Sequence, residues 1–210
     1  MQDYTAKALL PACSWNEAMV GQLWDSFGPP DTYTWSAEIG TGCDRLGKVS
    51  DRPARIIQDR QQMVALLQQL PYIDYIVLTV EVAEAGNIAI VFRNYPPAGG
   101  SYAVTGKTES WVQEKAAAIQ AVFSASRDQE ITRIYGKWTF GAIQTAIPLT
   151  AASIAVIAAA VLFIPAALRH SDYLWWITAG TVVLTLRLAY SISDRLILYV
   201  VKRFPYIRWQ

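Results

Sequence analysis

One glycine-rich stretch of the chain has the spacing of a phosphate-binding loop. Gly42 and Gly47 are separated by four residues and Lys48 follows, as in loops whose backbone N–H groups and lysine bind phosphates. The next position should be Ser or Thr to hold Mg²⁺, but it is Val49. Such a loop also runs directly into a helix, whereas residues 50–53 (SDRP) are typical of a turn. We therefore predict a glycine-rich hairpin loop, and no cofactor.

The number and position of the histidine and cysteine residues argue against catalysis by these groups. His170 is the only histidine, and it lies in the turn between two apolar segments that we predict to cross a membrane, on the opposite side from Cys13 and Cys43. Neither thiol therefore has a histidine to activate it, and two cysteines alone form neither a disulfide framework nor a zinc site. No spacing demands that the carboxylates of the first half pair with one another: Glu38, Asp44, Glu81 and Glu84. We predict no metal site and no enzyme.

Polar and ionisable residues interrupt the apolar C-terminal part of the chain. Arg187 lies inside an apolar segment, and Ser191 and Asp194 follow it by four and seven residues, so the three share one face of a helix. If a membrane span ends at Ser193, Arg187 is about 9 Å deep and its long side chain can snorkel to the surface. If the helix continues to Val201, the three residues instead form a polar row that pairs internally or lines a path between assembled hairpins. The sequence leaves both interpretations open.

The charge distribution predicts the helices that carry these residues. Residues 139–168 contain no Asp, Glu, Lys or Arg, and residues 145–168 alone give about 36 Å of helix, against about 30 Å of hydrocarbon in a bilayer. A second apolar segment, residues 173–193, begins with aromatic residues of the kind that favour the membrane interface. The turn between the segments is so short that the two must be antiparallel. We predict a transmembrane hairpin with helices at 139–168 and 173–193.

Lysine and arginine counts predict how this hairpin is oriented. The turn between the two helices has one basic residue, Arg169. Basic residues flank the hairpin on both sides: Arg127, Arg133 and Lys137 before it, and Arg195, Lys202, Arg203 and Arg208 after it. The positive-inside rule then places both ends of the chain in the cytoplasm, and for a bacterial protein the hairpin in the inner membrane. The N-terminus lacks the long apolar core of a secretory signal, which agrees with this orientation.

The first apolar segment is rich in small residues. Ala151, Ala155 and Ala159 form a row with a spacing of four, which allows close helix contact in a lipid environment. The row packs either on the second helix of the same chain or on another copy of the chain.

The first 126 residues have the pattern of an α+β domain. Helices are predicted at 15–27 with a capping box of Ser14 and Glu17, at 55–70, and from Thr108 onward; strands are predicted at 32–39, 72–82, 87–95 and 101–105. This order of elements predicts an antiparallel sheet with helices on one face. We interpret residues 127–138 as a juxtamembrane linker and residues 194–210 as a cytoplasmic amphipathic tail.

Two aromatic residues of this domain are candidates for binding a protein partner. Tyr95 begins a loop rich in proline and glycine, where binding residues often lie, although an ordinary hairpin connection has the same pattern. Trp111 lies near the start of the last predicted helix of the domain, and the alternative interpretation is that it is a core residue. The near-neutral net charge of +1, with basic and acidic residues interleaved, predicts no direct nucleic-acid binding.

The segment of residues 102–123, followed by a charged linker and a two-helix hairpin, resembles bacterial two-transmembrane effector proteins of anti-phage defence systems, including those associated with retrons. The likeness is carried by a strand ending in Val104-x-Gly106 and a helix starting with Trp111-Val112. It implies a cytoplasmic domain that senses or is restrained by a partner, such as a reverse transcriptase–RNA/DNA complex. It also implies a hairpin that perturbs the inner membrane, alone or as a homo-oligomer. The alternative is a passive anchor or scaffold that presents a partner-binding domain, and an enzyme acting on a lipid or a nucleotide is a third.

Overall fold

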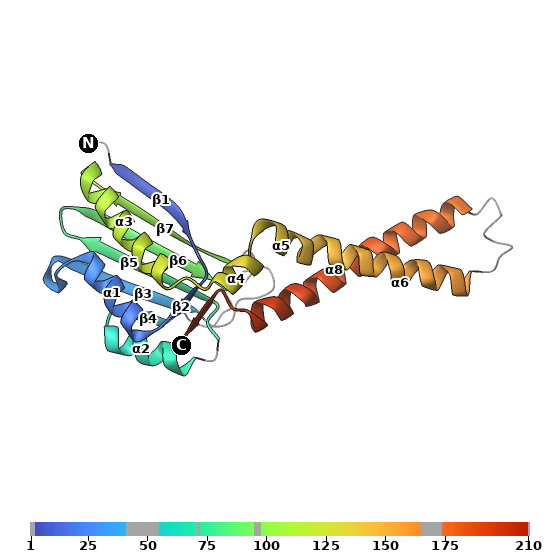
Figure 1. Cartoon of the computed structure of the whole chain (residues 1–210), viewed down its shortest axis with the longest axis horizontal. Helices are drawn as coiled ribbons and strands as arrows, with labels where there is room; N and C mark the ends of the chain where they lie inside the picture. Colours follow the sequence, from blue (N-terminus) through green and yellow to red (C-terminus); the bar gives the residue numbers. More distant parts are fainter. Residues whose placement is uncertain (1–2, 41–54, 71, 95–97, 165–173, 210) are drawn as a thin grey trace. The chain divides into compact units, whose positions relative to one another are not determined.

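The computed structural model describes residues 3–40, 55–70, 72–94, 98–164 and 174–209 (Figure 1). The chain forms two compact units. The first consists of residues 1–135 together with 201–210, and the second of residues 136–200. The chain therefore leaves the first unit once and returns to it at its C-terminal end.

The first unit is built on a six-stranded antiparallel sheet with the order β1-β7-β6-β5-β3-β4. Its strands are β1 (Tyr4–Leu10), β3 (Tyr33–Gly40), β4 (Arg55–Ile57), β5 (Tyr75–Val82), β6 (Gly86–Arg93) and β7 (Gly99–Gly106). The α+β class with an antiparallel sheet is thus confirmed. The sequence pattern did not predict β1, and the residues assigned to β4 were predicted as the start of a helix.

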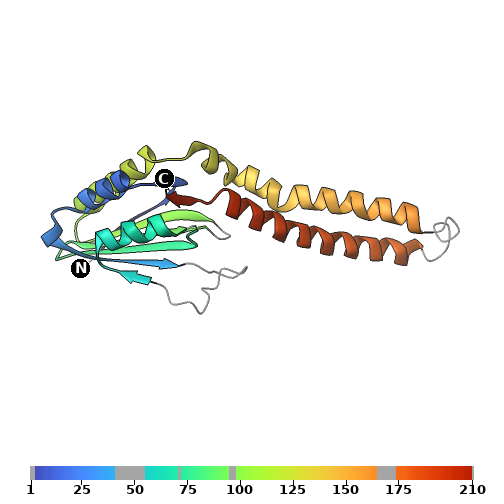
Figure 2. The same cartoon turned by 90° about the horizontal axis from the view of Figure 1, so that it is seen from below.

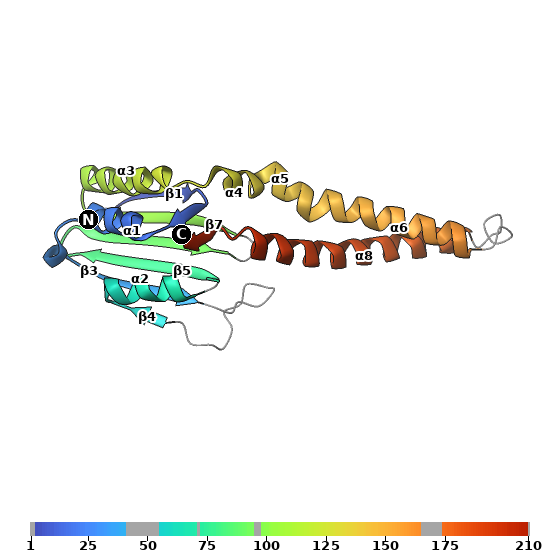
Figure 3. The ribbon, with the colours of Figure 1, turned by 60° about the horizontal axis from the view of Figure 1, so that its bottom comes forward.

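One face of the sheet carries the core. Along β6, Ile88, Ile90 and Phe92 are buried, Ala89 and Val91 between them are half-buried, and Asn87 and Arg93 on either side are exposed, as expected for a half-buried strand. The buried sheet residues form one hydrophobic cluster with three helices that cover this face: α1 (Glu17–Phe27), α2 (Arg60–Gln69) and α3 (Glu109–Ala125). Figure 2 shows these helices above the sheet, and Figure 3 shows α1 and α3 side by side.

Two of these helices begin later than the sequence pattern predicts. The cap of α1 is Asn16, whose Oδ1 accepts from the Met19 N–H at 2.8 Å, so a capping box at Ser14 is wrong. Ser14 instead lies in the short strand β2 (Cys13–Trp15). In the same way, Asp59 caps α2 by accepting from the Gln62 N–H at 2.8 Å. Asn16 and Asp59 have the extended backbone that is typical of a capping residue, so each helix begins only after its cap.

The C-terminal residues of the chain belong to the first unit. Strand β8 (Ile207–Trp209) pairs in parallel with β2, and the Tyr206 hydroxyl donates to the Leu10 carbonyl at 2.6 Å. Tyr206 and Ile207 are buried, and Arg208 forms an ion pair with Asp128 at 3.4 Å. The prediction of an amphipathic tail running to the last residue is therefore wrong for residues 206–209, which complete a protein core.

The second unit contains two long apolar helices. The first is a continuous helical run made of α5 (Lys137–Gly141), the π-helical turn η2 (Ala142–Ala146) and α6 (Ile147–Phe163). The second is α8 (Leu174–Arg203), which runs on into the first unit at its end. Both are long and apolar enough to cross a membrane. Short helices elsewhere in the described parts of the chain are η1 (Pro30–Thr32) and α4 (Gln129–Ile134), the latter within the predicted linker.

Candidate functional site

The polar residues of α8 lie on the surface of the second unit. Arg187 and Ser191 are exposed and Asp194 is half-buried, and all three belong to one uninterrupted helix that continues to Arg203. Tyr190 is exposed as well and follows Arg187 by three residues. We refer to Arg187, Tyr190, Ser191 and Asp194 as the polar row. It lies on a helix that does not end at Ser193.

One hydrogen bond aligns the two long helices near one end. The Ser193 hydroxyl donates to the Gln144 carbonyl at 2.7 Å, which joins α8 to the π-helical turn η2. Trp138 comes six residues before Gln144, and Tyr199 comes six residues after Ser193, each roughly 9 Å along its helix. The two helices are antiparallel (Figure 2), so these equal distances from the Ser193–Gln144 bond place Trp138 and Tyr199 at a similar level.

Exposed aromatic side chains mark both ends of the two helices. Trp138 and Tyr199 lie at one end, Phe163 and Trp175 at the other, and all four are between 63% and 88% exposed. The distance from Trp175 to Tyr199 is 24 residues, or roughly 36 Å of helix. Arg187 is twelve residues from each of them, so it lies midway between the two aromatic levels. The sequence pattern identified the tryptophans of the second segment but missed Trp138 and Tyr199, because their exposure is visible only in the structure.

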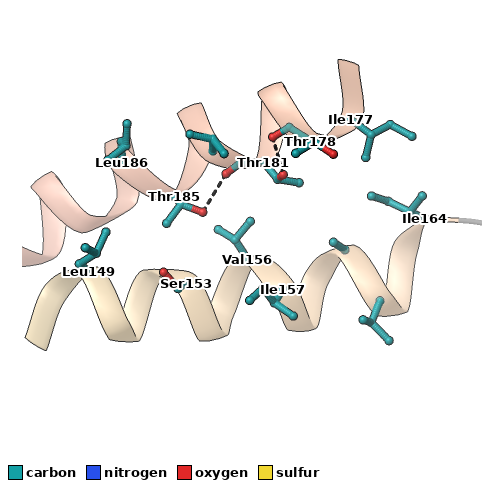
Figure 4. A pocket seen from close by; sticks show the side chains of 13 residues that line it. Leu149, Ser153, Val156, Ile157, Ile164, Ile177, Thr178, Thr181, Thr185 and Leu186 are labelled. Atoms are coloured by element: carbon teal, nitrogen blue, oxygen red, sulfur yellow. Dashed lines mark hydrogen bonds between the residues drawn. The ribbon is translucent and has the colours of Figure 1, made fainter. Parts of the chain in front are cut away.

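A groove of about 480 Å³ lies between the two long helices (Figure 4). Its lining runs from Leu149 to Ile164 on α6 and from Ile177 to Leu186 on α8. The groove is lined mostly by apolar side chains, and the hydroxyls of two of its threonines are used within α8 itself. Thr185 donates to the Thr181 carbonyl at 2.7 Å and Thr181 to the Thr178 carbonyl at 2.8 Å.

The small-residue row of α6 lies mainly on the surface of the unit. Ala151 and Ala155 are exposed and Ala159 is half-buried, whereas Ala152 is fully buried. The buried residues of α6 are Pro148, Ala152 and Val156, none of which belongs to the predicted row. Ala151 and Ala155 remain on the outer surface of the unit.

Trp111 covers two glycines at the ends of neighbouring strands. A Cβ atom on Gly106 would lie 2.6 Å from Cε3 of Trp111, and one on Gly86 would lie 2.9 Å from its Cζ3. Val104 and Val112 are both buried in the core. The pattern of valine, glycine and tryptophan that carries the effector resemblance is therefore explained by packing of α3 on β7. Trp111 itself is half-buried, so part of its ring is accessible to a partner.

Several predicted features lie outside the described residues: Tyr95, the loop at 42–49 with Cys43, and His170. Cys13 is described and buried, and burial raises the pKa of its thiol to about 12. The Trp15 indole N–H donates to its sulfur at 3.1 Å. Among the described residues no cluster of three or more His, Cys, Asp or Glu side chains could hold a metal ion. Comparison of the chain with protein-family models, with curated proteins and with solved structures gives no match.

Proposed function

We propose that this chain is a two-span protein of the bacterial inner membrane whose hairpins assemble and perturb the bilayer. The observation that carries this proposal is the position of Arg187 midway between two levels of exposed aromatic residues. Tryptophan and tyrosine favour the headgroup region on both sides of a membrane, and a separation of roughly 36 Å fits the hydrocarbon core with its interfaces. In this arrangement the apolar surfaces of α6 and α8 contact lipid.

Arg187 then lies near the bilayer centre. It is about 18 Å along the helix from either aromatic level, well beyond what one arginine side chain bridges by snorkelling. A charged residue at that depth costs about 3 kcal/mol on insertion scales, and such residues usually face protein or a water-filled path. Association of several hairpins would remove the polar row from lipid and surround it with polar groups of neighbouring copies. The exposed Ala151 and Ala155 favour the close helix contact that this requires.

The wider role that we propose is that of an effector in anti-phage defence. Its α+β unit would lie in the cytoplasm with both chain ends and would be restrained or triggered by a protein partner. The sequence resemblance to two-transmembrane effectors supports this role, and the return of residues 206–209 to the α+β core supports a unit that holds both ends of the hairpin. A change in that unit would reach both helices at once.

Membrane potential in cells that express the full chain tests the proposal. We expect depolarisation when the chain is made without its restraining partner, and we expect Arg187→Leu to abolish it while Arg187→Lys retains most of it. Tyr199→Phe is the control, because it keeps the aromatic end of the helix. Equal amounts of inserted protein must be shown for all variants. Normal potential with abundant inserted wild-type protein, under every triggering condition, would contradict the proposal.

Replacement of residues 136–200, the whole second unit, by an unrelated two-helix anchor separates an effector from a passive anchor. An effector loses activity in this chimera because the polar row is gone. Full protection by the chimera in a phage challenge would instead support the anchor.

A further inference from the structure

We propose that the α+β unit binds a mononucleotide in a cavity between the C-terminal part of α1 and the start of β3. The cavity has a volume of about 550 Å³, within the range of about 300–1,000 Å³ that is usual for small-molecule sites. Its lining includes aromatic, cationic and anionic side chains: Trp24, Asp25, Tyr33, Trp35 and Arg60. This site is independent of the membrane role proposed above.

A buried donor without a partner is the first observation. Trp24 lines the cavity and is 5% exposed, and its indole Nε1 has no hydrogen-bond acceptor within the described part of the chain. Leaving a buried N–H unpaired costs roughly 1–3 kcal/mol, so such groups are rare in folded proteins. The nitrogen itself has less than 1 Å² of accessible surface, so a ligand acceptor in the cavity reaches it only once the side chains over it move.

The walls of the cavity favour a flat ring. Trp24 and Trp35 pack edge to face, with ring centroids 4.8 Å apart and an interplanar angle of 89°. Trp35 and Tyr33 are only half-buried, so both leave ring surface accessible at the cavity. Aromatic side chains of this kind bind nucleobases by stacking, with little dependence on the base. The half-buried rings supply that surface.

Opposite charges lie beside the same rings. Arg60 and Asp25 are exposed at the cavity, and both act electrostatically on the Tyr33 phenol, whose pKa is raised mainly by burial. The Arg60 guanidinium also lies over α1, since a Cβ atom on Gly21 would be 3.0 Å from its Nη2. A guanidinium held in this way suits the two oxygens of a phosphate.

A mononucleotide fits these three groups together. Its base stacks on the half-buried Trp35 and Tyr33 rings, its amino or sugar hydroxyl groups offer donors to the Asp25 carboxylate, and its phosphate pairs with Arg60. A ring acceptor of the base meets the Trp24 N–H after the side chains over that nitrogen move. An inorganic anion would use Arg60 alone, and a neutral apolar ring would leave both Arg60 and Asp25 unpaired in the complex. The combination of donor, acceptor and cation therefore selects a phosphorylated nucleoside.

Calorimetric titration of the full chain in detergent micelles tests this site. The probes are the 5′-monophosphates of adenosine, guanosine, cytidine and uridine, the matching nucleosides, and inorganic phosphate. We expect at least one monophosphate to bind, its nucleoside to bind about tenfold more weakly, and inorganic phosphate not to compete at equal concentration. Trp24→Phe keeps the ring but removes the N–H, and Arg60→Gln removes the cation, so each should weaken binding about tenfold.

Arg55→Gln is the matched control, because Arg55 is an exposed arginine outside the cavity. Circular dichroism must show that every variant is folded. The proposal is overturned if no monophosphate binds the folded wild-type chain at millimolar concentration. It is equally overturned if a monophosphate binds but Trp24→Phe and Arg60→Gln leave its affinity unchanged, because the nucleotide would then occupy another place.

Discussion

The side-chain amide of Asn94 holds the backbone of Ile207 on both sides. Its Oδ1 accepts from the Ile207 N–H at 2.8 Å, and its Nδ2 donates to the Ile207 carbonyl at 3.1 Å. The same Nδ2 donates to the Ile73 carbonyl at 2.5 Å, and Asn94 is fully buried. One side chain thus gives the N–H and carbonyl of Ile207 the hydrogen bonds that a neighbouring strand would supply on that side.

Removal of this amide should destabilise the α+β unit. Asn94→Ala leaves the N–H and carbonyl of Ile207 and the carbonyl of Ile73 buried without partners, so we expect a loss of about 3 kcal/mol in the free energy of unfolding. Denaturant unfolding of the full chain in detergent, followed by the near-ultraviolet signal of the tryptophans, measures this. Asn87→Ala is the control, because Asn87 is exposed on β6. Equal losses in both variants would show that the amide does not hold Ile207.

Substitution of Gly106 should reveal how closely Trp111 packs. Gly106→Ala places a Cβ atom 2.6 Å from Trp111 and 2.9 Å from the Ala85 carbonyl, so we expect a loss of about 1–3 kcal/mol. Gly99→Ala in the same strand meets no atom within 4 Å and should be nearly neutral. Thermal unfolding of the two variants compares them directly. A neutral Gly106→Ala would mean that Trp111 moves freely and is available to a partner.

Alkaline pH should weaken the first unit through Cys13. Burial raises the folded-state pKa of this thiol from 9.0 to about 12, so its contribution to stability is complete below pH 9 and is lost as the pH rises toward 12. Burial raises the pKa values of the Tyr206 and Tyr135 phenols as well, which acts in the same direction. We expect the fall in unfolding temperature above pH 9 to be shallower in Cys13→Ala. An identical pH profile in both proteins would contradict burial of the thiol.

Cysteine crosslinking should show which face of α6 meets another copy. In a chain with Cys13→Ala and Cys43→Ser, we expect Ala155→Cys to form crosslinked dimers in membranes, because Ala155 is exposed. Ala152→Cys should not, because Ala152 is fully buried. Oxidation followed by non-reducing electrophoresis gives the comparison. Crosslinks at neither position would argue against self-association through the small-residue row.

Local sequence patterns predicted most elements that alternate strongly or follow a clear cap. The hairpin of β5 and β6 and the helix α3 were predicted because their apolar residues recur with the periods of strand and helix. Strand β1 was missed because its inward residues include two alanines, Ala6 and Ala8, which give little contrast with the exposed Lys7 and Leu9. Hydrophobic contrast, rather than strand propensity alone, makes a strand visible in a sequence.

The return of the C-terminal strand β8 to the α+β core could not be predicted from the sequence, because it depends on long-range pairing with β2. Ile207 pairs with Cys13, and no local pattern indicates a partner so distant along the chain. Arg187, Ser191 and Asp194 of the polar row were predicted from helical spacing, whereas the midway position of Arg187 needed the exposed Trp175 and Tyr199 on one continuous helix. The cavity beside Trp24 and Arg60 was missed for the same reason, since its residues come from α1, β3 and α2.

The central claim is that the polar row lies inside the bilayer, and the depth of spin labels tests it most directly. Labels at Trp175→Cys, Leu186→Cys and Tyr199→Cys, in a chain without Cys13 and Cys43 and reconstituted in liposomes, keep Arg187 in place. Leu186 is exposed and adjoins Arg187. We predict that the label at 186 collides most with oxygen and least with a water-soluble relaxant, and that the labels at 175 and 199 lie near the two headgroup regions. A label at 186 as accessible to the water-soluble relaxant as the label at 199 would contradict the account.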